Sequence, residues 1–321
     1  MKKLCLLSLI WIAAWQLAAA QQEQLYTQFM YNKLAWNPGY AGSFESPTLV
    51  AVYRNQFVGL EGAPKTVALS FNMPYNGERV NFGVNVMQHS IGITHILNLD
   101  LLPFTYRIPM RYGKLGIGFQ VSIRQFSQNW SDSRLVTFDT DDDAVPIEAN
   151  NKIIVNPGIG VYYTSTRNNW YAGVAVPRVV PSSIDFSSIG DKEDISREVW
   201  HVNAMGGYAF KAGKDLRITP QVLLKYALGA PFQADINTTL LWKEKYSGGL
   251  TYRTGGGETS AIGESVDLQL GLQATEKIFV CLSYDLGLTP LRSYHKGSVE
   301  LTARYWFNPP PPDDVIYENP Y

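Results

Sequence analysis

The stretch Ser298-Val299-Glu300-Leu301-Thr302-Ala303-Arg304-Tyr305-Trp306-Phe307 alternates with a period of two residues near the end of the chain. Its odd-numbered positions are all apolar or aromatic, whereas its even-numbered positions mainly carry hydroxyl groups or charges. Because successive side chains of a β-strand point to opposite faces, the stretch predicts a strand with one apolar and one polar face. Such a strand suits a membrane barrel, whose outer face meets lipid and whose inner face meets a polar lumen.

The same alternation recurs along most of the chain and predicts fourteen antiparallel strands. Most of these segments span about 9–13 residues, which is longer than the roughly 5–6 of soluble strands and enough to cross a bilayer when tilted. An even number of strands predicts an all-β, transmembrane, up-and-down β-barrel with periplasmic N- and C-termini. The predicted strands are 48–57, 65–73, 79–88, 96–108, 113–126, 153–165, 169–176, 198–210, 215–227, 231–242, 245–254, 262–274, 276–286 and 297–307.

Aromatic residues gather near the ends of several predicted strands, as they do in the interfacial girdles of membrane barrels. One such residue would indicate only core packing, but their recurrence favours a membrane barrel over a soluble sandwich, which also alternates. The residues are Trp170, Tyr171, Trp200, Phe232, Trp242, Tyr305 and Phe307.

The connections between the predicted strands form a long set and a short set. With the N-terminus in the periplasm, the connections facing outside are 58–64, 89–95, 127–152, 177–197, 228–230, 255–261 and 287–296. Those facing the periplasm are 74–78, 109–112, 166–168, 211–214, 243–244 and residue 275. Among the connections facing outside, only 228–230 is short. This difference in length between outer and periplasmic connections is typical of bacterial outer-membrane barrels, which have short periplasmic turns.

The N-terminus has the three parts of a secretory signal peptide. Met1-Lys2-Lys3 is basic, residues 4–17 are mostly apolar, and Ala18-Ala19-Ala20 offers small residues for cleavage after Ala20. The apolar run is too short for a spanning helix, which needs about 20 residues. We therefore predict a signal peptide at 1–20 and export of the mature chain to the outer membrane.

Two regions lack the alternation. Residues 21–47 are polar and aromatic, which predicts a periplasmic or lumenal N-terminal segment ahead of a barrel at 48–307. Residues 308–321 begin with an asparagine and four prolines, and proline cannot donate a ladder hydrogen bond. We predict a proline-rich periplasmic tail there, which is either a docking peptide or a remnant without a partner.

The composition excludes several classes of function. Without Lys2 and Lys3 the chain has 25 basic and 28 acidic residues, a balance that argues against a nucleic-acid-binding protein. Cys281 is the one cysteine left after cleavage, so we expect neither a disulfide framework nor a cysteine-rich metal site.

Few residues form a pattern that would carry chemistry. The alternate aspartates of 139–143 suit calcium, but Ala144 replaces the turn glycine and Asn150 the bidentate glutamate, which favours a solvated acidic loop. His89 and His95 would face each other across an outer hairpin as an incidental pair. No nucleophile elbow or Ser/His/Asp set is evident, so we expect no enzyme, no catalytic residue, no cofactor and no metal.

Charged residues on the polar faces would point into the predicted lumen. They would either cross-link a filled lumen or line a selective pore, and the sequence leaves both open. A diffusion pore or solute transporter is therefore an alternative to a protein-binding role. The residues are Arg54, Arg124, Arg217, Lys225, Asp235, Lys243, Asp267, Asp285, Glu300 and Arg304.

Four short motifs stand at the start of the mature chain, and they are Gln28-Phe29-Met30-Tyr31-Asn32, Asn37-Pro38-Gly39-Tyr40-Ala41-Gly42-Ser43, Tyr53-Arg54-Asn55-Gln56-Phe57 and Gly62-Ala63-Pro64-Lys65-Thr66. These motifs resemble the PorP/SprF family of outer-membrane proteins of the Bacteroidetes, which is linked to the type IX secretion system and to gliding motility. The final predicted strand is similar as well. Phe57 stands where a tryptophan is common in the family, and Gly39 where an alanine is common.

The resemblance implies an accessory role that is exercised by protein binding. Members of the family help particular type IX cargo, such as large surface adhesins, to reach or stay on the cell surface. Outer loops 127–152 and 177–197 would then hold cargo, while the N-terminal segment and the tail at 308–321 would contact type IX or peptidoglycan-anchoring periplasmic components.

The motif residues also have structural interpretations. The Asn-Pro-Gly and Ala-Gly-Ser sequences form turns, which would fold the N-terminal segment under or into the barrel. Arg54 would tie this segment to the lumen wall, and Gly62 with Pro64 would close the first hairpin. The candidate partner-binding or structural residues are Phe29, Asn32, Asn37, Pro38, Tyr40, Gly42, Tyr53, Arg54, Gln56, Gly62 and Pro64.

Overall fold

The computed structural model describes residues 26–44, 46–75, 79–129, 150–166, 169–184, 198–228, 230–255 and 263–308. The predicted signal peptide at 1–20, the acidic stretch 139–143 and residues 309–321 lie outside the described residues. Most residues of the predicted loops 127–152 and 177–197 also lie outside the described residues. In the described part, no helix combines the length and the apolar character that a membrane crossing requires.

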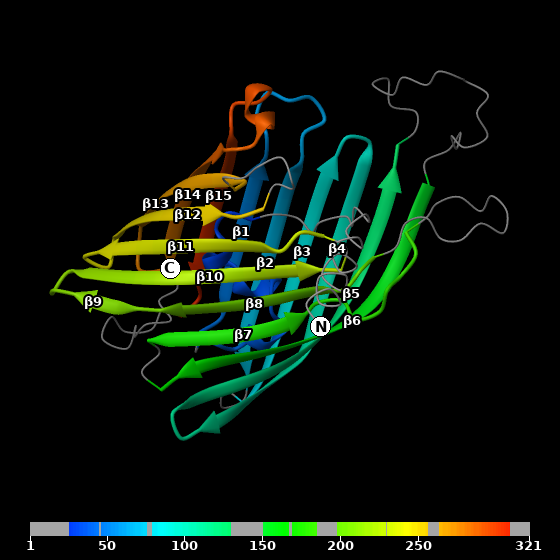
Figure 1. Cartoon of the computed structure of the whole chain (residues 1–321). Helices are drawn as coiled ribbons and strands as arrows, with labels where there is room; N and C mark the ends of the chain where they lie inside the picture. The colour runs from blue at the N-terminus through cyan, green and yellow to red at the C-terminus, as the bar shows by residue number, and fades with distance from the viewer. Residues whose placement is uncertain are drawn as a thin grey trace, which may run out of the picture.

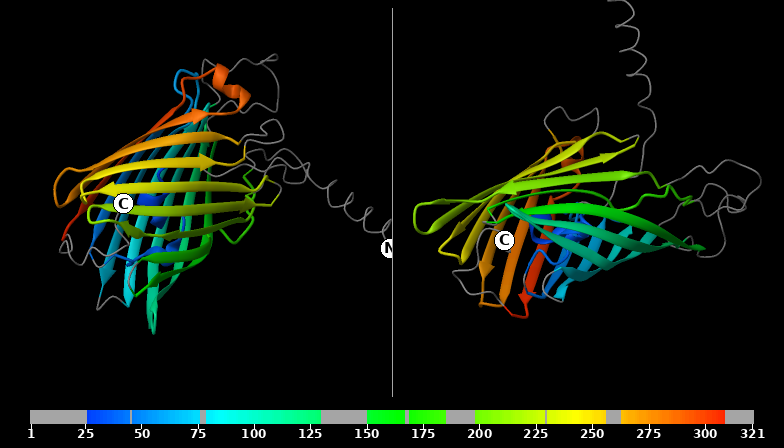
Figure 2. Two further views of the ribbon diagram at one scale, coloured as in Figure 1. Left: turned by 60° about the vertical axis from the view of Figure 1, so that its left-hand side comes forward. Right: turned by 90° about the horizontal axis from the view of Figure 1, so that it is seen from below.

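One antiparallel sheet closes on itself into the barrel (Figures 1 and 2). Strands β8 and β9 are separated by Ala209 and both pair with β10, so they count as one interrupted strand, and the predicted total of fourteen is confirmed. Strand β15 pairs with β1 to complete the ring. The strands are β1 (Thr48–Asn55), β2 (Lys65–Tyr75), β3 (Val80–Ile91), β4 (Thr94–Met110), β5 (Gly113–Gln128), β6 (Asn150–Ser165), β7 (Trp170–Val176), β8 (His201–Tyr208), β9 (Phe210–Ala212), β10 (Leu216–Ala227), β11 (Gln233–Trp242), β12 (Tyr246–Arg253), β13 (Ser265–Gln273), β14 (Ile278–Gly287) and β15 (Ser298–Trp306).

The two faces of the strands reverse the pattern of a soluble protein. In β13, Leu268 and Leu270 are 52% and 74% exposed, whereas Asp267 and Gln269 are buried. A soluble sandwich would bury the leucines, because burial of apolar surface drives folding in water. Apolar side chains outside and polar side chains inside are the arrangement of a barrel in lipid. The faces therefore decide between the two folds that alternation alone allowed.

Aromatic residues at strand ends follow the predicted girdle in part. The side chains of Trp170, Trp242 and Phe307 are exposed on the outer surface. Tyr171 instead faces the lumen and is buried, since it is the next residue after Trp170 on the same strand and therefore points to the opposite face.

Three details differ from the sequence predictions. The predicted outer loop 89–95 is mostly strand, because β3 and β4 continue to a tight turn at Gly92, whose φ of +55° suits glycine. His89 points inward and its ring Nδ1 lies 2.8 Å from the Thr66 hydroxyl, whereas His95 is exposed, so the two histidines do not face each other. Lys243 is exposed in the turn after β11, with φ of +51°, and does not reach the lumen.

The lumen holds the first described part of the chain, residues 26–44, which we call the plug. It folds into three short 3₁₀ helices, η1 (Phe29–Tyr31), η2 (Lys33–Ala35) and η3 (Pro38–Tyr40), which appear as the dark blue coil within the barrel in Figure 1. Its apolar side chains pack against inward-facing apolar residues of the wall and form the main core of the molecule. On the plug these are Tyr26, Phe29, Met30, Tyr31, Leu34, Trp36 and Tyr40, and on the wall they include Val50, Val52, Leu102, Tyr162, Met205, Leu223, Leu241 and Phe279.

The plug begins and ends at opposite rims of the barrel. Tyr26 lies at the rim of the long connections, where Arg253 at the end of β12 donates a hydrogen bond to its carbonyl (3.1 Å). Gly42 lies toward the rim of the short turns, where its N–H donates to Asn72 Oδ1 of β2 (2.7 Å). Strand β1 starts at this second rim, which is also where β15 ends.

Candidate functional site

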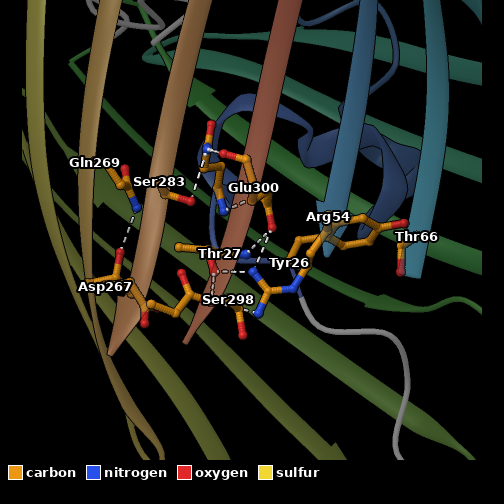
Figure 3. Close-up of polar contacts among 12 residues, drawn as sticks. Tyr26, Thr27, Arg54, Thr66, Asp267, Gln269, Ser283, Ser298 and Glu300 are labelled. Atoms are coloured by element: carbon orange, nitrogen blue, oxygen red, sulfur yellow. Dashed lines mark hydrogen bonds and ion pairs between the residues drawn. The ribbon is translucent and has the colours of Figure 1, made fainter. Parts of the chain in front are cut away.

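A buried ion cluster fastens the first residues of the plug to the wall (Figure 3). The guanidinium of Arg54 on β1 contacts Asp285 Oδ2 of β14 (2.7 Å) and Glu300 Oε2 of β15 (3.0 Å). The Thr27 hydroxyl accepts a hydrogen bond from Arg54 (2.6 Å) and donates one to Asp285 (2.7 Å). Glu300 also accepts the backbone N–H groups of Thr27 and Gln28 (2.8 and 2.9 Å). We call these five residues the latch.

The charged groups of the latch are removed from solvent and therefore need partners within the protein. Arg54 and Glu300 are 1% and 0% exposed, so each charge is compensated by protein groups. Charge-assisted hydrogen bonds are among the strongest in proteins, but a buried charge that loses its partner is costly. The latch therefore depends on all its members together.

A second ion cluster meets the plug from another part of the wall. Asp235 on β11 accepts hydrogen bonds from Arg253 Nε (2.8 Å) and from Lys225 Nζ (2.9 Å). Arg253 also donates to the carbonyl of Tyr26. The start of the plug is thus held by β12 as well as by β1, β14 and β15.

The Asn-Pro-Gly turn of the plug lies against a part of the wall that has no side chains. Gly116 and Gly118 of β5 and Gly160 of β6 form this glycine patch. A Cβ atom at Gly118 would lie 2.3 Å from the carbonyl oxygen of Pro38, and one at Gly160 would lie 2.2 Å from Asn37 Oδ1. The close approach of the plug therefore requires glycine at these wall positions.

Hydrogen bonds hold the same turn in place. The side chain of Asn37 accepts from Gly39 N–H (2.8 Å) through Oδ1 and donates to the carbonyl of Val161 (3.0 Å) through Nδ2. The Thr105 hydroxyl on β4 donates to the carbonyl of Pro38 (2.9 Å). Asn37, Pro38 and Gly39 thus form the local turn and also contact three strands of the wall, β4, β5 and β6.

Two further contacts position the middle and the end of the plug. The ammonium group of Lys33 lies 3.6 Å from the ring centre of Tyr171, close enough for a cation–π interaction. Arg107 on β4 donates to the carbonyl of Gly42, whose φ is +75°. A Cβ atom at Gly42 would lie 2.0 Å from the side chain of Asn81, so glycine is required there for both reasons.

Of the eleven candidate residues, Arg54 belongs to the latch, and the other ten fall into three groups. Tyr53 points away from its neighbour in the latch, Arg54, and is 46% exposed on the outer face, so it does not contact the plug. In the connection from β1 to β2, Gln56 N–H donates to the carbonyl of Pro64 (2.9 Å) and Gly62 has φ of +71°. The others are buried within the plug, and they are Phe29, Asn32, Asn37, Pro38, Tyr40 and Gly42.

Several residues that hold the plug were not singled out by the sequence. Alternation placed Asp285 and Glu300 on the lumen face, but no local signal pairs them with Arg54, which lies 231 and 246 residues away. The glycine patch left a weak signal, since Gly116 and Gly118 occupy alternate positions of the polar face of one strand.

The residues of this site bind a peptide segment, namely the plug. Both oxygens of Glu300 are engaged by protein donors, and wall residues accept from or donate to the plug backbone. Among the described residues, no group of three or more His, Cys, Asp or Glu side chains could hold a metal ion. Part of the polar lumen face therefore binds the chain's own segment.

These features define a transmembrane β-barrel of the outer-membrane type whose lumen contains its own N-terminal segment. The family model for the type IX secretion system membrane protein PorP/SprF matches residues 18–305, so the chain belongs to the PorP/SprF family. It is accordingly an outer-membrane component of type IX secretion, with lipid and secretion-system proteins as its general partners.

Solved structures resemble the chain only distantly. The Acinetobacter baumannii outer membrane protein Omp33 is 11% identical with a TM-score of 0.46, and the match covers 82% of this chain and 98% of that one. A Pseudomonas aeruginosa FadL homologue is 12% identical with a TM-score of 0.45, over 85% of this chain and 93% of that one. No curated protein matches the chain.

Proposed function

We propose that the protein is an accessory barrel that binds protein and helps specific type IX cargo, such as an adhesin, to be secreted or retained at the cell surface. The observation that carries the proposal is the plug, because a barrel wall engaged with an internal segment has little free polar lumen for solutes. The remaining surfaces for partners are then the two rims.

The difference between the rims supports an assignment of partners. The rim of the long connections would face outside and bind cargo, since long extracellular loops and short periplasmic turns are the rule for such barrels. The rim of the short turns, together with the tail at 308–321, would face the periplasm. There it would contact components of the secretion machinery or of the peptidoglycan anchor.

The plug argues against the alternative of a diffusion pore. It contacts β1, β2, β4, β6, β12, β14 and β15 through hydrogen bonds, so it reaches well-separated parts of the wall. A solute pathway through the part of the lumen that the plug occupies would require the plug to move and would break the latch.

Deletion of the gene tests the proposed function. We expect one or a few cargo proteins to disappear from the cell surface while the other secreted proteins remain, and expression of the intact gene to restore them. The measurement is quantitative mass spectrometry of surface-attached and released proteins. An unchanged surface proteome in the deletion strain would refute the accessory role.

A further inference from the structure

The rim of the short turns carries more positive than negative charge. Strands β9 to β14 follow one another around the barrel, and their turns lie side by side at this rim, at the left of Figure 1 for the hairpin of β11 and β12. A surface with such a surplus attracts anions. Among the described residues, the exposed basic side chains at this rim are Arg79, Arg111, Lys211, Lys214, Lys243, Lys245 and Lys277, and the exposed acidic ones are Asp215, Glu244 and Glu276.

The turn between β11 and β12 directs its negative charge toward the lumen side. Glu244 accepts a hydrogen bond from the guanidinium of Arg217 (2.7 Å), a buried residue of the lumen face. Lys243 and Glu244 both have φ of +51°, a conformation in which asparagine and glycine are the usual residues of a hairpin turn. Lysine thus occupies position 243 although its backbone conformation there is unfavourable. Strain of this kind is concentrated at functional sites.

The two lysines of this turn lie against aromatic rings of the outer face. The ammonium group of Lys243 lies 4.7 Å from the ring centre of Trp242, and that of Lys245 lies 5.6 Å from the ring centre of Tyr246. The two rings are neighbours across the β11–β12 ladder, with their centres 5.8 Å apart, and both side chains are 48% exposed. The cation–π contacts therefore bring two positive charges to the outer side of the turn.

The position of this group relative to the lipid follows from the outer face of the same strands. Farther from the turn, the outward-facing residues include Leu240 of β11 and Leu250 of β12, which are 43% and 50% exposed. An apolar band that ends in aromatic residues marks the boundary of the hydrocarbon region, and the rings lie at the level of the lipid headgroups. Lys243 and Lys245 are adjacent to the rings and therefore lie at that level too.

We propose that Lys243 and Lys245 bind the phosphate of an anionic phospholipid in the leaflet at the rim of the short turns. Their ammonium groups donate hydrogen bonds to the phosphate oxygens, as charge-assisted bonds. Trp242 and Tyr246 pack against the glycerol and the adjoining part of the acyl chains, because their rings combine an apolar body with a polar group. This inference goes beyond the proposed function, since it concerns the membrane and not the cargo.

An acidic protein is a poorer occupant of this surface. The rings of Trp242 and Tyr246 lie on the side of the wall, on the same face as Leu240, so a molecule that covers them also contacts the lipid-facing surface. A phospholipid meets this requirement. A soluble protein would approach the end of the turn instead, where the side chain of Glu244 is 55% exposed and would repel an acidic partner.

The test measures lipid binding to the purified full-length protein by native mass spectrometry. Titration with phosphatidylglycerol, which is anionic, should give tighter binding than titration with phosphatidylcholine, which has no net charge. We expect the double variant Lys243→Gln, Lys245→Gln to bind phosphatidylglycerol about thirtyfold more weakly, since each lysine near a membrane surface contributes about fivefold. The double variant Lys243→Arg, Lys245→Arg keeps both charges and should retain binding.

A matched control uses two exposed lysines at the opposite rim. The double variant Lys65→Gln, Lys296→Gln removes the same charge and should leave the affinity for phosphatidylglycerol unchanged within about twofold. Circular dichroism of every variant checks that the barrel folds. Equal affinity of the intact protein for the two lipids, or equal losses in the two glutamine variants, would overturn the inference.

Photocrosslinking in cells distinguishes a lipid from a protein at this surface. A photoreactive residue in place of Tyr246 should form adducts with phospholipid, which mass spectrometry of the purified protein detects. Adducts with a periplasmic protein at this position, without lipid adducts, would show that a protein covers the rings and would overturn the inference. The accessory function is tested separately by the surface proteome of the deletion strain.

Discussion

At the scale of single residues, the Glu300 carboxylate accepts two backbone N–H groups of the plug and one hydrogen bond from Arg54. Glu300→Gln removes the negative charge of this side chain. The buried guanidinium of Arg54 then loses one of its two carboxylate partners. We expect the free energy of unfolding to fall by about 3–5 kcal/mol, as when one partner of a buried pair is removed. Urea titration of the refolded barrel in detergent, followed by tryptophan fluorescence, measures the change.

The ion pair between Arg217 and Glu244 provides the matched control. Its N–O distance is 2.7 Å, the same as between Arg54 and Asp285, but the Glu244 side chain is 55% exposed. Glu244→Gln should therefore change the free energy of unfolding by at most about 1 kcal/mol. Equal losses in Glu300→Gln and Glu244→Gln would show that the latch does not hold the plug.

The glycine patch gives a second prediction at this scale. Gly118→Ala places a methyl group against the carbonyl of Pro38 and should displace the turn of the plug, at a cost of about 1–3 kcal/mol. Limited proteolysis should then cut within residues 26–44 faster than in the wild type. Gly248→Ala on β12 is the control, since its added Cβ meets no atom within 4 Å. Similar proteolysis of both variants would contradict the fit between plug and patch.

Inward and outward positions of single residues were largely readable from the sequence. The period of two placed Arg54, Asp285 and Glu300 on the inner face, where the structure finds them. It failed at Lys243, because the strand ends at Trp242 and a turn with positive φ breaks the period. The ion-pair partners of Arg54 could not be predicted from the sequence, since they depend on which strands pair to close the barrel.

At the scale of elements, the outer face of the strands is adapted to lipid. Leu270 lies within β13 and is 74% exposed, whereas Leu228 follows the end of β10 and is 64% exposed. Leu270→Arg should lower the free energy of unfolding in lipid vesicles by about 2–4 kcal/mol, and Leu228→Arg by about 1 kcal/mol or less, because the cost depends on depth. Equal effects in vesicles, measured by urea titration, would show that β13 does not cross the lipid core.

Elements with alternation were predictable and the element without it was not. Fourteen strands followed from the period of two and from turn residues, and the boundaries shifted where hairpins were tighter than expected, as at Gly92. Residues 26–44 showed only turn chemistry, which allowed a place under the barrel or within it. Their position depends on contacts such as Asn37 with Val161, which lie 124 residues apart.

At the scale of the whole molecule, barrel and plug form one structure with a shared core. The aromatic residues of the plug supply apolar surface that the polar lumen otherwise lacks, and the latch ties the plug to strands from both ends of the chain. Deletion of residues 26–44 should therefore leave a barrel with an open, polar lumen that is less stable than the intact protein. We expect this variant to form ion-conducting channels in planar bilayers.

Conductance of the purified full-length protein in planar bilayers tests the central claim that the plug closes the lumen. The structure predicts no large, stable channel from the intact protein under conditions in which the variant lacking residues 26–44 conducts. A large, persistent conductance from the intact protein, equal to that of the variant, would contradict a closed lumen and would favour the solute pore.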